Sequence, residues 1–377
     1  MIIKKAYGCY IEDDQGKVYI DTTMGSGAQI LGHGNKLIKK ITAQVVDGTI
    51  YTVPNFHTQE VCKLLKKINP EYSEKYIFCN SGTEANMRAI RLARAFTGKK
   101  IIGRFHGGWH GGLDGFIDEH PDNHGVPDEI NNLYRVLPYN QDECFDMIDN
   151  TLAAVIIEPT QGSNPRDDIG PFLKKIAAKC KKEGVLLILD EVMTGFRLSK
   201  KGGAAIFDIT GDIVTYGKVL GGGFPIGAVA GKEKIMNTKN VFYGGTFSAN
   251  PLSMFSAKNI LMAIEAGSVI DYDYLYKIGN KFRSHLNDFF QKNNKNIRVI
   301  GIGPLSRIVF TNHFIRNRKD RDRLESSQKK QTIFYNLLLE NGVFVNGNRL
   351  FHFSMCHNEE VVQELIDKIK KVSLNLL

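Results

Sequence analysis

The chain has 377 residues, of which 42% are hydrophobic, and this is enough to bury a large core in roughly two domains. It has no uninterrupted apolar stretch of about 18 residues, and its first residues lack the apolar run of a secretory signal, so we expect no membrane span and no export. The net charge of +9 is interspersed with acidic residues, even in the basic stretch 316–323. This favours a solvated surface and argues against nucleic-acid binding.

The cysteines are scattered along the chain and form no Cys-x-x-Cys pair, which predicts reduced thiols in the cytoplasm and no disulfide framework. Two histidine pairs have the four-residue spacing of a helical metal site: His106 with His110, and His120 with His124. Their surroundings do not predict a helix, so we expect no metal site.

The first 40 residues predict a β-hairpin. Residues 8–11 and 17–20 are strand-like, and the polar residues 13–16 between them are typical of a turn. We therefore expect a separate N-terminal segment over residues 1–40.

Short apolar runs alternate with helix-like segments through the middle of the chain. A run at 76–78 precedes an expected helix near 84–96, and a run at 153–157 precedes an expected helix near 171–183. Further runs lie at 100–102, 185–189, 213–215 and 227–230. This alternation predicts an α/β fold with a mostly parallel sheet covered on both faces, and we place this large domain at residues 41–255.

The remaining residues, 256–377, show the order helix, strand, strand, helix. The last helix is expected at 359–372, where apolar residues recur at helical spacing: Val361, Val362, Leu365, Ile366 and Ile369. The pattern predicts a smaller α/β domain.

Asp190 and Lys218 have the clearest chemical meaning. Asp190 ends the apolar run 185–189, and Lys218 lies downstream between small and apolar residues. A carboxylate at the end of a buried strand and a lysine in such a setting suit pyridoxal phosphate. The lysine forms a Schiff base with the cofactor, and the carboxylate keeps its pyridine nitrogen protonated.

Two further stretches could hold the same cofactor. Ser81, Gly82 and Thr83 begin a predicted helix, where free N–H groups and hydroxyls could bind a phosphate, although a simple helix cap would look the same. Trp109, the only tryptophan, lies in a glycine-rich loop. It could stack on a pyridine ring or serve as a packing residue.

Glu158 follows a predicted strand, so its carboxylate could order a network beside the cofactor or lie in a surface turn. The glycines at 221–223 would let the backbone pass close to a ligand, and the stretch 244–251 offers further phosphate contacts. Both could also be ordinary loops.

Together these stretches resemble the class III, fold type I aminotransferases that use pyridoxal phosphate, and within that family the glutamate-1-semialdehyde aminomutases most. The resemblance covers most of residues 15–260, with matching blocks at 80–97, 158–159, 189–197, 216–231 and 245–251. It implies a large cofactor domain built on a mostly parallel sheet and a smaller α/β C-terminal domain.

The resemblance also implies roles around the cofactor ring. Lys218 would be the Schiff-base lysine, and Asp190 would hold the pyridine nitrogen. Val192 would pack beneath the ring and Trp109 would stack above it. Glu158 would lie near the phenolic side of the ring, where Ser163 is matched as well.

The cofactor phosphate would be held by Ser81, Gly82 and Thr83. By the same resemblance, Thr246 would complete the phosphate site of a neighbouring subunit, which implies a homodimer with shared active sites.

Three features differ from the aminomutases. An Asn-Ser-Pro-Val-Arg type stretch, whose arginine contacts the substrate carboxylate in that group, is not found in this sequence. Ser26 stands where the aminomutases have a tryptophan, which implies a wider pocket. Arg349 falls where they have a glutamate, so it would clamp a carboxylate or phosphate, unless it is a surface residue in a poorly aligned loop.

The resemblance implies an aminotransferase that moves an amino group, with L-glutamate expected as donor, to a small anionic carbonyl acceptor. A phosphorylated ketone such as dihydroxyacetone phosphate, giving serinol phosphate, fits the gain of Arg349. Enzymes of this type also occur in pathways of bacterial surface polysaccharide biosynthesis. Two alternatives stay open: a glutamate-1-semialdehyde 2,1-aminomutase, and an inactive binding module of the same fold, against which Lys218 and Asp190 speak.

Overall fold

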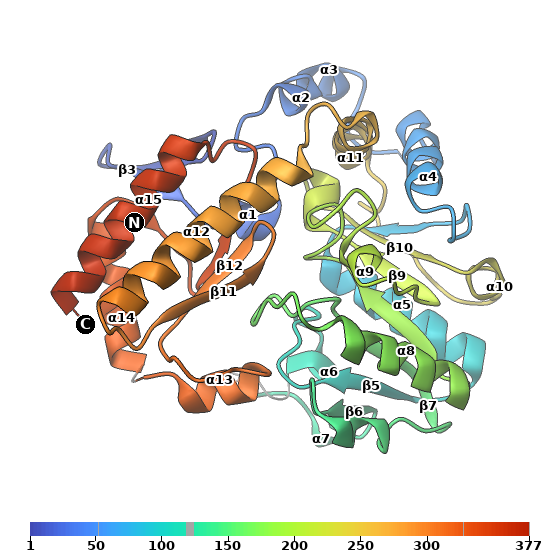
Figure 1. The fold of residues 1–377 in the computed structure, drawn as a ribbon. Coiled ribbons are helices and arrows are strands. Elements are labelled where there is room, and N and C mark those ends of the chain that lie inside the picture. The colour runs from blue at the N-terminus through green and yellow to red at the C-terminus, as the bar shows by residue number, and fades with distance from the viewer. Residues whose placement is uncertain (52, 118–123, 327, 377) are drawn as a thin grey trace. The chain divides into compact units, whose positions relative to one another are not determined.

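The computed structural model describes residues 1–51, 53–117, 124–326 and 328–376 (Figure 1). Its contacts divide the chain into two compact units. Unit 1 comprises Met1–Lys39, Ser163–Asp167 and Gly267–Leu377, and unit 2 comprises Lys40–Gly162 and Asp168–Ala266. None of the helices in the described part of the chain has the length and apolar character needed to cross a membrane.

Unit 2 is built on a seven-stranded sheet. In spatial order its strands are β4 (Ile77–Cys79), β10 (Gly227–Gly231), β9 (Ile213–Tyr216), β8 (Leu186–Asp190), β7 (Leu152–Ile157), β5 (Ile101–Phe105) and β6 (Tyr134–Leu137). Strand β10 runs antiparallel to both of its neighbours, and the pairs from β9 to β6 are parallel. All six residues of β7 are buried, as expected for a strand covered on both faces. The predicted mostly parallel sheet is therefore confirmed.

Long helices cover this sheet. Helix α5 (Gly82–Thr97) packs against β7 to β10 and contributes Ala85, Ala89 and Leu92 to the core, while α8 (Gly170–Glu183) contacts β8. In Figure 1, α8 lies in front of the sheet and α5 behind it. Helices α4 (Phe56–Ile68) and α11 (Pro251–Ala266) pack against each other.

The shorter elements of unit 2 connect these parts. They are α3 (Ile41–Val46), α6 (Asp114–Ile117), α7 (Asp128–Asn131), α9 (Gly203–Ile206), α10 (Glu233–Met236) and two 3₁₀ turns, η1 (Asp142–Phe145) and η2 (Lys218–Gly221).

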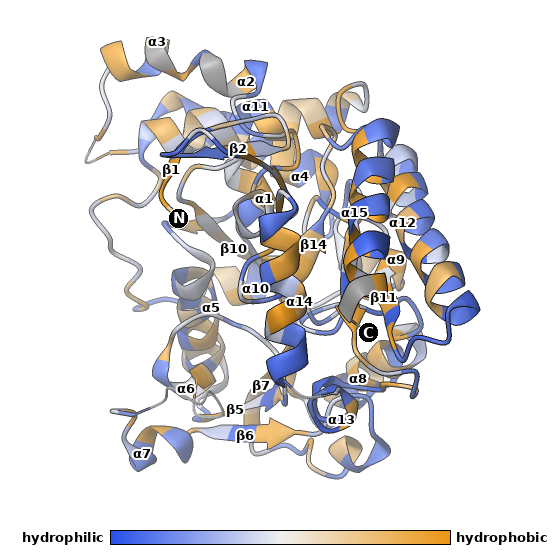
Figure 2. Ribbon diagram, turned by 90° about the vertical axis from the view of Figure 1, so that its left-hand side faces the viewer, coloured by the Kyte–Doolittle hydropathy of each residue, from blue (hydrophilic) through white to orange (hydrophobic). Residues whose placement is uncertain are grey.

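Unit 1 contains two smaller sheets. One has the order β1 (Ile3–Tyr7), β2 (Tyr10–Asp13), β3 (Val18–Asp21) and β13 (Val343–Phe344), and the other has the order β11 (Arg298–Ile302), β12 (Leu305–Val309) and β14 (Leu350–His352). Its helices are α1 (Met24–Gly27), α2 (Lys36–Lys39), α12 (Tyr272–Lys292), α13 (Arg318–Leu324), α14 (Gln328–Glu340) and α15 (Glu359–Leu376). Figure 2 shows α12 and α15 with hydrophilic and hydrophobic stripes, which is the pattern of helices with one buried face.

The N-terminal hairpin does not stand apart from the C-terminal part of the chain. Its strands β2 and β3 pair antiparallel, and β13 adds to β3 in parallel, with Val343 opposite Ile20. This pairing explains why the first residues belong to unit 1. The division into an N-terminal hairpin segment (1–40), a large domain (41–255) and a small C-terminal domain (256–377) stays a proposal.

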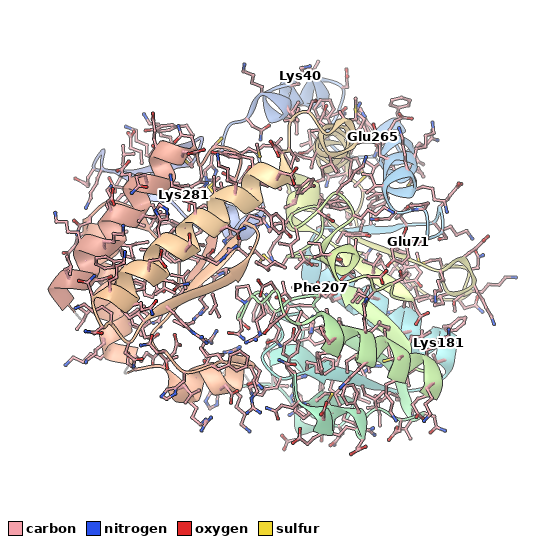
Figure 3. All side chains as sticks on the ribbon, in the orientation of Figure 1. Lys40, Glu71, Lys181, Phe207, Glu265 and Lys281 are labelled. Carbon is pink, nitrogen blue, oxygen red and sulfur yellow. The ribbon has the colours of Figure 1, made fainter. Side chains whose placement is uncertain are left out.

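Charged side chains are distributed over many elements (Figure 3). Lys181 lies in the last turn of α8, and Lys281 lies on α12. Several surface lysines have acidic partners, such as Lys67 with Glu265 at 2.7 Å. Positive and negative side chains are therefore mixed on the surface of these elements.

Candidate active site

Asp190 and Lys218 lie at the carboxyl ends of two adjacent parallel strands. Asp190 ends β8 and is paired with Thr215 of β9, and Lys218 follows three residues later at the start of η2. Ligands of open α/β sheets bind beyond the carboxyl ends of the strands. The sheet therefore brings these two residues to the edge where a cofactor is expected.

The side-chain amine of Lys218 has the properties of a nucleophile. It makes no hydrogen bond or ion pair with any residue that the structure describes. The side chain keeps some exposed surface, but the surrounding protein desolvates it and lowers the pKa of Lys218, against the opposing effect of the carboxylates of Asp190 and Glu158. A lowered pKa increases the neutral fraction of the amine, which is the nucleophilic and basic form.

The carboxylate of Asp190 is fixed by buried donors. Its Oδ2 accepts hydrogen bonds from Nδ1 of His110 and Nδ2 of Asn86, both at 2.7 Å. Its Oδ1 accepts one from the backbone N–H of Val192 at 3.0 Å. The hydroxyl of Thr215 donates to Oδ1 of Asn86 at 2.7 Å and so orients that amide. The carboxylate thus has a defined orientation.

This arrangement fits a protonated pyridine nitrogen. Each carboxylate oxygen can accept two hydrogen bonds, and Oδ1 of Asp190 has only one close donor among the described residues, since Thr215 lies 3.5 Å away and donates elsewhere. Nε2 of His110 is buried with no hydrogen-bond partner in the described chain, as expected when Nδ1 carries the proton shared with Asp190. Oδ1 of Asp190 can therefore accept one further hydrogen bond, from a cationic N–H.

The start of α5 fits a phosphate group. Ser81 is the helix cap, because its Oγ accepts from the N–H of Glu84 at 3.2 Å. The next N–H groups, of Gly82 and Thr83, have no acceptor among the described residues, as is typical of a first helical turn. A Cβ on Gly82 would lie 2.6 Å from Cγ1 of Val192, so only glycine allows Val192 to lie against the helix start. The geometry of the helix start is compatible with both interpretations of this motif, as a helix cap and as an anion site.

The glycine-rich loop brings Trp109 and Glu158 together. The backbone N–H of Trp109 donates to Oε2 of Glu158 at 3.1 Å, and the N–H of Gly162 donates to Oε1 at 3.1 Å. Burial raises the pKa of Glu158 to about 7. Trp109 is 52% exposed, although the neighbouring Gly107 and His110 are buried, so its side chain is accessible for stacking.

The other predicted site residues are placed differently. Thr246 is exposed in unit 2. Ser26, Ser163 and Arg349 belong to unit 1. There, the carbonyl oxygen of Ser163 accepts a hydrogen bond from Nη1 of Arg321. Their roles stay predictions.

No pattern in the sequence predicts His110, Asn86 and Thr215 as partners of Asp190. The spacing of His110 from His106 raises only a metal site, although His110 directly follows Trp109. Asn86 lies on the inner side of α5, where a polar residue buried to 1% exposure needs a partner. No group of three His, Cys, Asp or Glu side chains in the described chain could hold a metal, and His120 lies outside the described residues.

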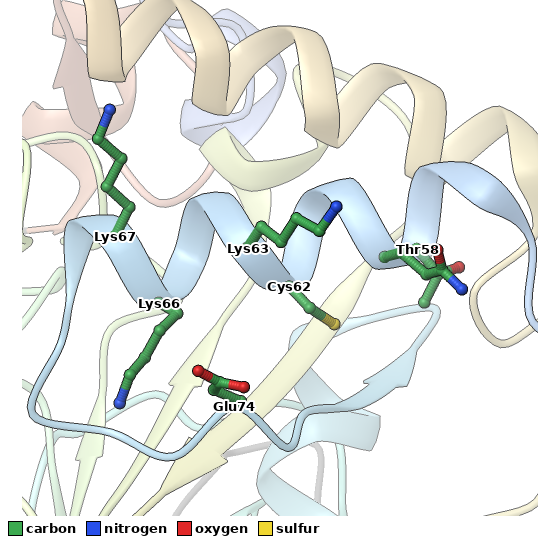
Figure 4. Close-up of a pocket in the computed structure, with 7 residues that line it drawn as sticks. Thr58, Cys62, Lys63, Lys66, Lys67 and Glu74 are labelled. Carbon is green, nitrogen blue, oxygen red and sulfur yellow. The ribbon is translucent and has the colours of Figure 1, made fainter.

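A hollow of about 540 Å³ lies beside α4 (Figure 4). Its lining comprises Thr58, Gln59, Cys62, Lys63, Lys66, Lys67 and Glu74. Lys66 donates to the carbonyl oxygens of Pro70 and Tyr72, and Lys63 pairs with Glu60. These cations are already partnered, so we assign the hollow no function.

A family model for class III aminotransferases matches residues 1–372. This chain belongs to the class III aminotransferases. Among curated relatives, the glutamate-1-semialdehyde 2,1-aminomutase of Methanosphaera stadtmanae is 35% identical over 362 residues, covering 91% of this chain and 84% of its own. That of Sulfolobus acidocaldarius is 34% identical over 397 residues, covering 98% and 92%.

Solved structures of transaminases share the fold. An omega-transaminase from Sphaerobacter thermophilus superposes with a TM-score of 0.91 at 25% identity, covering 100% of this chain and 91% of its own. A β-phenylalanine aminotransferase from Variovorax paradoxus gives 0.88 at 27% identity, covering 98% and 86%. The class III chain is thus a fold type I, transaminase-type enzyme that depends on pyridoxal phosphate, as the sequence predicted.

Proposed function

We propose that this enzyme transfers an amino group from a small amino donor, with L-glutamate expected, to a small anionic carbonyl acceptor. The observation that carries the proposal is the unpaired amine of Lys218 beside the oriented carboxylate of Asp190, at the carboxyl ends of β9 and β8. Pyridoxal phosphate, when bound, supplies an electron sink for the substrate α-carbon.

Residues of the chain would bind the cofactor and transfer the proton. Lys218 would bind the cofactor covalently through Nζ, and the same nitrogen would then carry the proton between the substrate α-carbon and the cofactor. Asp190 would hold the proton on the pyridine nitrogen. Val192 and Trp109 would enclose the ring, and Glu158, with Ser163 as a further match, would order its phenolic side.

Phosphate binding would fall to Ser81, Gly82 and Thr83 at the start of α5. We propose that Thr246 completes this site in a neighbouring subunit, so that the enzyme is a homodimer with shared active sites. The large exposed side chains on either side of Thr246, Phe242 at 75% and Phe247 at 62% exposure, support a covered surface there.

The proposal also concerns the identity of the carbonyl acceptor. Arg349 would recognise its anionic group, and Ser26 would widen the pocket. A phosphorylated ketone such as dihydroxyacetone phosphate, giving serinol phosphate, is our candidate. The test loads the enzyme with the amino group from L-glutamate, removes the donor, and offers a panel of carbonyl compounds. The acceptor is the compound that restores the original visible spectrum at the lowest concentration, and a failure of every anionic compound would refute this part.

Glutamate-1-semialdehyde 2,1-aminomutase is the second candidate, because the curated relatives at 32 to 35% identity carry that name. The positions of Ser26 and Arg349 argue against it. Incubation with the semialdehyde alone separates the two candidates. An aminomutase isomerises it efficiently without an amino donor, whereas an aminotransferase needs both donor and acceptor.

We also propose a cytoplasmic location and a role in bacterial surface polysaccharide biosynthesis. The first is supported by the free state of the six cysteines: Cys9, Cys62, Cys79, Cys144, Cys180 and Cys356. The second follows only from the enzyme class. Loss of an amino-modified component from the polysaccharide of a deletion strain would support it.

A further inference from the structure

Arg88 of helix α5 binds the turn on which Thr246 lies. A hydrogen bond from the N–H of Ser248 to the carbonyl oxygen of Gly245 at 3.0 Å closes this turn, so Thr246 lies at its exposed tip. Nη2 of Arg88 donates to Oγ of Ser248 and to the carbonyl oxygen of Gly244, both at 3.1 Å. One guanidinium group therefore binds the chain on both sides of Thr246.

The guanidinium of Arg88 is itself fixed in unit 2. Only 3% of Arg88 is exposed, and its Nη1 donates to the carbonyl oxygen of Phe78 in β4 at 2.6 Å. The carboxylate of Glu84 lies 4.0 Å from Nη2, which is too far for a hydrogen bond. Because a guanidinium is planar and rigid, the bond at Nη1 also fixes the direction of Nη2. The turn is therefore held in a defined position relative to β4 and α5.

Gly245 leaves the space that Arg88 needs. A Cβ at this position would lie 2.9 Å from Nη2 of Arg88 and 2.6 Å from Oγ of Ser248. Both distances are shorter than real Cβ contacts, so any other residue would push the guanidinium and the hydroxyl away. The contact between Arg88 and the turn thus depends on a glycine at 245.

Two further hydrogen bonds hold the chain on either side of the turn. Nη1 of Arg91 donates to the carbonyl oxygen of Phe242 at 2.7 Å, and Nδ2 of Asn55 donates to that of Ala249 at 2.8 Å. These bonds lie before and after the turn, whereas Arg88 binds the turn itself. Ordering a free segment on binding costs conformational entropy, and bonds that order it beforehand reduce this cost.

We propose that Arg88 is a positioning residue for the cofactor phosphate of the neighbouring subunit, because it holds Thr246 in place. The inference rests on the proposed function, in which Thr246 completes the neighbour's phosphate site. Nη2 of Arg88 carries two hydrogens, and the turn accepts both, so Arg88 acts through the position of Thr246 and not through its own charge. In the homodimer, α5 would begin one phosphate site and support the other.

The test compares pyridoxal phosphate with pyridoxal, which lacks the phosphate group. Equilibrium dialysis against the full-length enzyme, freed of its cofactor, gives both dissociation constants. Arg88→Met keeps a long side chain without donors. It should weaken pyridoxal phosphate binding about tenfold and change pyridoxal binding less than about twofold. An equal loss for both compounds, or no loss for either, would overturn the proposal.

Two more variants guard against a purely structural effect. Ser248→Ala removes one acceptor of Arg88 and should weaken pyridoxal phosphate binding several-fold, again without affecting pyridoxal. If Arg88→Met does not fold, an unchanged constant for Ser248→Ala overturns the proposal in its place. Arg94→Gln is the matched control on the same helix, because Nε of Arg94 donates to the carbonyl oxygen of Lys100, outside the turn. It should bind pyridoxal phosphate as the parent does.

A double-mutant cycle with Thr246→Val separates this inference from the proposed function. Thr246→Val should itself weaken pyridoxal phosphate binding. In that background Arg88→Met should cause a smaller further loss than in the parent, because the hydroxyl that Arg88 positions is gone. Fully additive losses would contradict the positioning role alone. An unaltered dissociation constant for Thr246→Val would instead refute the shared phosphate site, and this inference with it.

Discussion

Nδ1 of His110 lies 2.7 Å from Oδ2 of Asp190, and only about 2% of either side chain is exposed. A hydrogen bond to a charged group in such a low-dielectric setting contributes about 1.5–3 kcal/mol. It holds the carboxylate of Asp190 in one orientation at the end of β8. We infer that His110 positions the group on which cofactor binding depends.

Replacing His110 with glutamine is expected to weaken pyridoxal phosphate binding by roughly 10- to 100-fold, because Asp190 loses a charge-assisted donor. Cofactor dissociation by equilibrium dialysis measures the change. His124→Gln, in an exposed turn, is the control and should bind normally. An unaltered dissociation constant for His110→Gln would mean that the pair is structural only.

Lys218→Ala should lower the rate of amino transfer by at least about 10³-fold, because it removes both the covalent attachment point and the proton carrier. Stopped-flow measurement of the half-reaction with L-glutamate gives the rate. Lys232→Ala, at an exposed lysine paired with Asp212, should retain the parent rate. A Lys218→Ala enzyme with nearly full activity would remove Lys218 from the mechanism.

Glu158 should make stability depend on pH. Burial raises its pKa from 4.5 to about 7, so between these values the folded protein binds the proton more tightly than the unfolded chain. The contribution is fully present below the unfolded pKa and is lost as pH rises through about 7, a change on the order of 3 kcal/mol.

Glu158→Gln has no such proton to lose. Its stability relative to the parent, both in the cofactor-free form, should therefore increase as pH is raised from about 5 to about 8. Urea unfolding at each pH measures the difference, and the exposed Glu233→Gln is the control. A difference that does not vary with pH would show that Glu158 is charged throughout.

Much of the fold could be predicted from local patterns. The apolar runs at 153–157 and 185–189 coincide with β7 and β8 to within one residue, and the helix expected near 171–183 matches α8. The antiparallel direction of β10 and the addition of β13 to β3 could not be predicted, because they depend on contacts between distant parts of the chain.

The candidate site also contains some residues that local sequence predicts and others that it does not. Asp190 and Lys218 were found because each carries a local signature, a buried strand before one and glycines around the other. His110 and Asn86 contribute through hydrogen bonds to Asp190 across 80 and 104 positions of sequence, which no local pattern encodes. The sequence around Arg349 does not indicate its partners, whereas the structure places it against Gln331 and Tyr335.

The proposed sharing of sites predicts complementation between two inactive variants. Lys218→Ala and Thr246→Glu, which would repel the phosphate, should each be inactive alone. After mixing and reassembly, activity should recover to roughly a quarter of the parent value, because half of the dimers are mixed and each mixed dimer has one intact site. Recovery is measured with L-glutamate and the acceptor identified from the panel. If the variants form mixed dimers and no activity returns, Thr246 does not serve the partner's site.

The most direct test of the central claim is chemical reduction of the enzyme with pyridoxal phosphate bound. Borohydride makes the carbon–nitrogen link between cofactor and lysine permanent, and peptide mass spectrometry then identifies the modified residue. The account predicts a stoichiometric pyridoxyl group on Lys218, with the other lysines unmodified. A label on a different lysine, or no label on an enzyme shown to retain its cofactor, would contradict it.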